Sequence, residues 1–144
     1  MLLPRGITEQ GGANYRAFRG HCYEAARSVG GKVELVETPR AGLLCNYSLA
    51  IIRIRDDSTA VALNDNFPWL AFATPPRSLW LDFIDHPIWA AEFQRIGGYH
   101  LCSAADMRQF PTPEILQDLG PKERKEVQYY RSKRVGDVVF NFWD

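Results

Sequence analysis

The side chains best suited to metal or nucleophilic chemistry in this 144-residue chain are three histidines and three cysteines. Structural zinc sites need four nitrogen or sulfur ligands and usually supply them as pairs two to four residues apart. No CxxC pair occurs, and the adjacent His21 and Cys22 would point about 100° apart on a helix. The odd number of widely spaced cysteines also argues against a disulfide framework. We therefore expect reduced thiols and predict no catalytic residue, no metal ligand and no cofactor; the residues considered are His21, Cys22, Cys45, His86, His100 and Cys102.

A small acidic cluster beside a histidine offers an enzymatic alternative. Asp82 and Asp85 precede His86 closely in the sequence, and carboxylates beside an imidazole can exchange protons or hold a metal. The competing interpretation is structural, because Asp85 or His86 precedes Pro87 and can cap a helix that begins there. We favour capping. The alternative is a small metal- or Cys/His-dependent hydrolase that uses Asp82, Asp85, His86, His100 and Cys102.

The most basic part of the chain is residues 122–134, which also contains Tyr129 and Tyr130. Basic groups with stacking rings can bind single-stranded nucleic acid, which is the second alternative function. Glu123 and Glu126 dilute this run, and the whole chain has 17 basic and 17 acidic residues, for a net charge of zero. Nucleic-acid modules usually carry a basic excess. We therefore favour a solvated helix with ion pairs and expect no nucleic-acid partner.

Aromatic residues make up 12% of the chain and include four tryptophans. Tryptophan and tyrosine often anchor protein interfaces, although they are also ordinary core residues. Several tryptophans lie near aspartates in the sequence, which suits a binding face that mixes aromatic anchors with acid. We predict a protein partner, and the predicted partner-binding residues are Asp65, Trp69, Asp82, Asp85 and Trp89.

The first half of the chain must position these residues with one helix and a β meander. Residues 1–12 predict an irregular arm. An apolar stripe then predicts a helix that Asn14 caps and Gly30-Gly31 ends; its members are Tyr15, Phe18, Cys22, Ala25 and Val29. Alternation of apolar and polar residues and turn signals predict an antiparallel meander of about four strands, with strands over 33–38, 43–55, 59–63 and 67–73 and turns at 56–58 and 64–66.

The second half is expected to be mainly helical. Ile88, Trp89, Phe93 and Ile96 form a helical stripe that Gly97-Gly98 stops. Further helices are predicted after Ser103, which pairs with Asp106 as a cap, after residue 112, and from residue 121 to about 131. Residues 135–143 alternate with large apolar groups on both faces, which predicts a final strand that is buried on both sides or lies at an interface. Such an edge would allow a homodimer.

Together these elements predict a single α+β domain over residues 1–144. No uncharged stretch approaches the roughly 20 residues that a membrane helix requires, so we expect no membrane partner. Residues 1–20 lack a charged start followed by an apolar run, so we expect no secretory signal and a cytoplasmic location.

Three short segments resemble small bacterial proteins: residues 135–144 (VGDVVFNFWD), 83–87 (FIDHP) and 66–69 (NFPW). The proteins that these segments resemble are immunity proteins of polymorphic-toxin systems. The resemblance implies a cytoplasmic, non-catalytic protein that binds and blocks a cognate toxin. It assigns no site residues.

Overall fold

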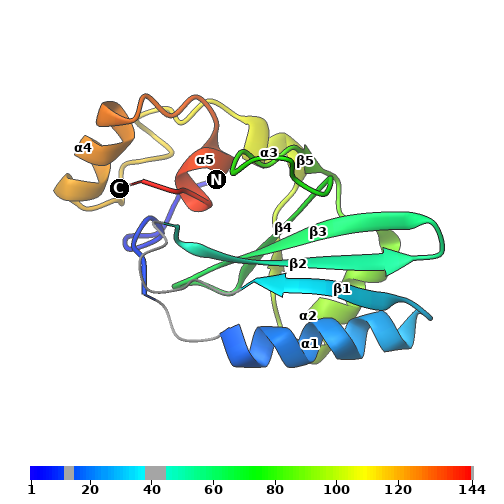
Figure 1. Cartoon of the computed structure of the whole chain (residues 1–144). Helices are drawn as coiled ribbons and strands as arrows, with labels where there is room; N and C mark the ends of the chain where they lie inside the picture. The colour runs from blue at the N-terminus through cyan, green and yellow to red at the C-terminus, as the bar shows by residue number, and fades with distance from the viewer. Residues whose placement is uncertain (12–14, 38–44, 144) are drawn as a thin grey trace.

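The computed structural model describes residues 1–11, 15–37 and 45–143, and within them it confirms the α+β class (Figure 1). The strands form one sheet of order β1-β2-β3-β4-β5, in which neighbours are antiparallel, and β6 pairs in parallel with β4. In chain order the elements are α1 (Tyr15–Ser28), β1 (Lys32–Glu37), β2 (Tyr47–Ile54), β3 (Asp57–Asn64), β4 (Trp69–Ala73), β5 (Phe83–Ile84), the 3-10 turn η1 (Ile88–Ala90), α2 (Ala91–Gly97), β6 (His100–Leu101), α3 (Ala104–Arg108), α4 (Pro121–Tyr129) and α5 (Val135–Val139).

Helix α1 forms where the apolar stripe predicts it. Phe18, Cys22 and Ala25 are fully buried. The helix ends as expected at the glycine pair, since Gly30 has a left-handed φ of 73° and the Gly31 N–H donates to the Ala26 carbonyl at 2.8 Å. The predicted cap at residue 14 lies outside the described residues.

The β meander is also confirmed. Strands β2 and β3 pair from Tyr47 opposite Asn64 to Ile54 opposite Asp57. This register leaves Arg55 and Asp56 as a two-residue loop, one residue earlier than the predicted turn. Arg55 adopts a left-handed φ of 57° there, as tight hairpin loops require.

The sheet carries a separate core on each face because successive strand residues point to opposite sides. We call one side the α1 face: Ala50, Ile52, Val61 and Phe72 pack there with residues of α1 and α2. We call the other side the C-terminal face. Residues of the N-terminal arm and of α3, α4 and α5 pack there against Tyr47, Ala60, Ala62, Ala71 and Ala73.

The predicted final strand over 135–143 is wrong. Residues 135–139 form helix α5, followed by an irregular segment. Val135, Val138 and Val139 lie at helical spacing and are all fully buried, so a helical stripe competes with the alternating pattern and prevails. Residues 135–143 therefore offer no strand edge, and the homodimer stays a prediction.

One smaller feature of the C-terminal half also differs from its prediction. The helix predicted after residue 112 is a series of turns over 113–118. By contrast, Ser103 caps α3 as predicted, because its Oγ accepts from the Asp106 N–H at 3.0 Å.

Among the described residues, no helix has the length and apolar character needed to cross a bilayer.

Candidate functional site

Part of the segment between β4 and η1 is held in place through its backbone carbonyl groups. Four carbonyl oxygens between residues 79 and 83 accept hydrogen bonds from four other parts of the chain: Tyr47 Oη donates to Leu79 (3.1 Å), Arg134 Nη1 to Leu81 (2.8 Å), the Thr74 N–H to Asp82 (3.1 Å) and Arg108 to Phe83. Burial raises the pKa of Tyr47 to about 12, which keeps its hydroxyl protonated as a donor. This segment therefore has a defined shape although little of it is helix or strand.

Side chains along this segment alternate between core and solvent. Leu81 and Phe83 are buried, whereas Leu79, Trp80 and Asp82 are exposed, with Trp80 exposed by 58%. The Trp80 ring nonetheless has one aromatic neighbour: its centroid lies 4.9 Å from that of Phe142, and the two ring planes meet at 85°. The segment thus presents a large apolar ring to solvent from an ordered backbone.

The same mixture of acid and apolar groups continues into η1. Asp85 and His86 are exposed, and Ile88 is 97% exposed. Capping was the wrong interpretation of these polar residues, since Pro87 is the N-cap of η1 and no side chain caps it. Trp89 is half-buried, and its ring lies 6.0 Å from that of Phe72 on the α1 face.

The structure separates the five predicted partner-binding residues into two groups. Asp82 and Asp85 flank β5, which pairs with the Phe72–Ala73 end of β4, and Trp89 packs on Phe72. Trp69 begins β4 at its other end, about 13 Å away along the strand, where its ring lies 4.9 Å from the His100 ring. Asp65 precedes β4, and its carboxylate accepts from the Gly11 N–H at 3.1 Å. Asp82, Asp85 and Trp89 are therefore neighbours, whereas Asp65 and Trp69 belong to another region.

The histidines and cysteines do not converge. His86 lies against Phe72 and His100 against Trp69, at opposite ends of β4. Cys102 is buried, and burial raises its pKa to about 12, so the thiol is protonated and a poor nucleophile. Within the described parts of the chain, no three His, Cys, Asp or Glu side chains are grouped so that they could hold a metal ion.

The other proposed zinc ligands are also engaged elsewhere. The Nδ1 of His21 lies 2.7 Å from the Tyr99 hydroxyl, whose pKa burial raises to about 12. Cys22 lies in the core on the α1 face, and burial also raises the pKa of its thiol. Cys45 is half-buried, and burial is the main cause of its raised pKa.

The basic run over 122–134 forms α4 and the turn after it. Some of its side chains make contacts with other parts of the chain. Arg134 pairs with Asp137 at 2.5 Å, Arg124 donates to the Leu119 carbonyl, and the Tyr130 ring stacks on that of Trp143 at 5.2 Å. Tyr129 remains a highly exposed ring.

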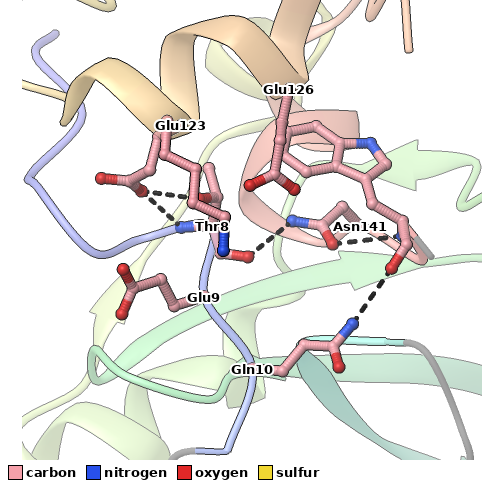
Figure 2. Close-up of a pocket in the computed structure, with 8 residues that line it drawn as sticks. Thr8, Glu9, Gln10, Glu123, Glu126 and Asn141 are labelled. Atoms are coloured by element: carbon pink, nitrogen blue, oxygen red, sulfur yellow. Dashed lines mark hydrogen bonds between the residues drawn. The ribbon is translucent and has the colours of Figure 1, made fainter. Parts of the chain in front are cut away.

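A polar hollow of about 480 Å³ lies between the N-terminal arm, α4 and the C-terminal segment (Figure 2). Three acidic residues line it, and one of them, Glu123, is buried and accepts hydrogen bonds from the arm and from Gly120. Asn141 donates to the Thr8 carbonyl at 3.1 Å, and Gln10 donates to the Trp143 carbonyl at 3.1 Å. These residues join distant parts of the chain, so their role here is structural.

The sequence analysis missed this buried polar network. Its members are polar residues with little or no exposure, namely Thr8, Asn46, Asn64, Glu123 and Asn141. Asn46 and Asn64 both donate to the carbonyls of Ile7 and Val139. One usable signal is Asn141, which interrupts an apolar run, because a buried amide must find partners. Another is Glu123 at the third position of a helix, where a carboxylate can bond back to the N-cap.

Comparisons with known proteins identify no relative: no family model matches the chain, and neither a curated protein nor a solved structure matches it.

Proposed function

We propose that this protein is a non-catalytic protein-binding module, an immunity protein that occludes a cognate bacterial toxin in the cytoplasm. The observation that supports this proposal is the ordered segment from residue 79 to residue 88. Its backbone is fixed at four carbonyls, yet it exposes Leu79, Trp80 and Ile88. We call this the 79–88 segment.

Preorganised apolar anchors are what a tight protein interface uses. Trp is enriched among the residues that dominate binding energy, and a segment already held in one conformation loses little entropy on binding. Scattered exposed apolar residues need no explanation. Here, however, three such residues lie within one stretch of ten residues whose backbone is partly held by hydrogen bonds, which is less common.

The charge of the segment indicates the chemistry of the partner. Asp82 and Asp85 are exposed beside the apolar side chains. A matching surface would have an apolar centre flanked by lysine or arginine, because complementary charge sets specificity and association rate. A toxin that binds nucleic acid through basic residues would offer such a surface.

The test uses the chain as bait in a lysate of the source organism. The variants are Trp80→Ala and the double charge reversal Asp82→Lys/Asp85→Lys. The matched control is Glu114→Lys/Asp118→Lys, which makes the same charge change at two exposed positions in the 113–118 turns. We expect the wild type and the control to capture one protein that arrests growth when expressed alone and not when co-expressed with the chain.

The two site variants should lose that capture. Removing a central Trp anchor typically costs about 2 kcal/mol or more, roughly a 30-fold loss of affinity. A captured protein that is harmless when expressed alone would overturn the immunity function. A toxic partner that both site variants bind as tightly as the wild type does would instead overturn the placement of the interface.

A further inference from the structure

Strand β1 lies at one end of the sheet. It is the terminal strand of the sheet order and, among the described residues, pairs only with β2. Figure 1 shows β1 at the margin of the sheet, next to α1. An edge of this kind presents a row of backbone donors and acceptors that another strand can use.

A bulge gives the side chains of β1 an unusual order. Val33 lies opposite Ile52 of β2, but Leu35 lies opposite Ile51, so Glu34 is an extra residue. Glu34 and Leu35 consequently both lie on the C-terminal face. Glu34 accepts a hydrogen bond from Ser58 Oγ at 2.5 Å there.

Each side chain of β1 belongs to one of the two faces of the sheet. With this bulge, the succession of faces from Lys32 to Glu37 is the same as the succession from Glu37 to Lys32. The two valines, Val33 and Val36, are half-buried on the α1 face. The other four side chains are exposed and belong to the C-terminal face: Lys32, Glu34, Leu35 and Glu37. A strand with a palindromic pattern of faces can pair antiparallel with a copy of itself without placing any residue on the wrong side.

We propose that this protein forms a homodimer in which β1 pairs antiparallel with β1 of a second copy. The twofold axis passes between Glu34 and Leu35. Lys32 then lies opposite the partner's Glu37 at both ends of the ladder, and Val33 lies opposite the partner's Val36. Opposite charges and apolar pairs directly across a ladder both stabilise it.

The same features specify this register over its neighbours. A shift of two residues would place Glu34 opposite the partner's Glu37, a repulsive pair of like charges. It would also place Leu35 and Val36, which belong to different faces, opposite each other. Bulges and edge charges normally prevent strands from pairing. In this arrangement the two bulges oppose each other and the terminal charges attract.

A charge swap tests both the dimer and its register. Lys32→Glu and Glu37→Lys each create two like-charge contacts per dimer, whereas the double variant Lys32→Glu/Glu37→Lys restores two opposite-charge contacts. We expect each single substitution to raise the dimer dissociation constant roughly tenfold or more, and the double variant to recover it to within about threefold. Lys125→Glu, at an exposed position of α4, is the matched control and should leave the constant unchanged.

Sedimentation equilibrium over a concentration series measures these constants, and thermal unfolding checks that each variant is folded. Hydrogen exchange of the wild type supplies a second measurement that needs no substitution, because amides of β1 should gain protection as the protein concentration rises. A wild type that is monomeric up to several hundred micromolar overturns the proposal. So does a dimer that neither single substitution weakens, or one that the double variant fails to restore.

Discussion

Glu123 should be among the most sensitive single positions for stability in this chain. Its side chain is only 3% exposed and accepts four hydrogen bonds. Oε1 accepts from the N–H groups of Gly6 (2.9 Å) and Gly120 (3.1 Å), and Oε2 accepts from the Thr8 N–H (3.2 Å) and hydroxyl (2.6 Å). One carboxylate thus joins the arm to the start of α4.

The substitution Glu123→Gln keeps the shape of the side chain and replaces one acceptor oxygen with an NH₂ group. In the better orientation, the remaining oxygen faces Gly6 and Gly120, and the Thr8 hydroxyl rotates to accept from the new amide. The Thr8 N–H then has no acceptor, which costs about 1–3 kcal/mol. The remaining bonds also become weaker because their acceptor is no longer charged. We expect a total loss of about 2–4 kcal/mol in the free energy of unfolding.

Chemical denaturation at pH 7 and thermal unfolding measure this loss. For a chain of this size it lowers Tm by roughly 5–15 °C. The matched control is Glu126→Gln, three residues further along α4 and partly exposed, which should change stability by less than about 0.5 kcal/mol. Equal stability of Glu123→Gln and the wild type would refute the inference that these four hydrogen bonds hold the arm in place.

The same carboxylate makes stability depend on pH. Burial alone would raise the pKa of Glu123, but the hydrogen bonds from Thr8, Gly6 and Gly120 outweigh it and lower the pKa. A carboxyl group whose pKa is lowered by folding contributes stability above its unfolded pKa and loses it as the pH falls through the folded pKa. The difference in stability between the wild type and Glu123→Gln should therefore shrink below about pH 4.5. A difference that stays constant down to pH 3 would contradict this account.

Two further predictions concern the core and the thiols. Gly136→Ala should destabilise the protein by about 1–3 kcal/mol, although alanine favours helices. The reason is that the new Cβ would overlap the buried Phe83 ring and lie 3.1 Å from the Met107 carbonyl oxygen. A more stable variant in denaturant titration would contradict the packing of α5. In native protein, a thiol reagent should modify half-buried Cys45 first, and the labelling should increase above pH 9 as the thiolate forms. Mass spectrometry should detect labelling of the two buried cysteines, Cys22 and Cys102, only after unfolding.

The parts of the fold that the sequence predicts well are those governed by local patterns. The stripe of α1 involves many residues that agree with one period, and turn residues next to the alternating end of β2 indicate its hairpin with β3, so neighbours in the chain determine these elements. At residues 135–143 the same residues fit two periods, and packing against Phe83 and the sheet decides between them. Local pattern alone could not make that choice.

The candidate site depended even more on distant contacts. The exposed positions of Asp82 and Asp85 agree with a surface role, but the fixed conformation of residues 79–83 comes from Tyr47, Arg108 and Arg134. These donors lie up to 53 residues away in the sequence. Separating exposed from half-buried tryptophans likewise required tertiary contacts, because Trp69 and Trp89 are half-buried whereas Trp80 is exposed.

The way residues 3–11 are held has a consequence for biosynthesis. Leu3 and Ile7 are fully buried, and hydrogen bonds join the arm to partners 117 and 133 residues later. The arm is synthesised before α4 and the residues around Asn141, which complete its surroundings. Contacts of such large sequence separation close slowly. The arm should therefore remain open to proteases, with Ile7 uncovered, until the residues around Asn141 have been synthesised and have packed against it.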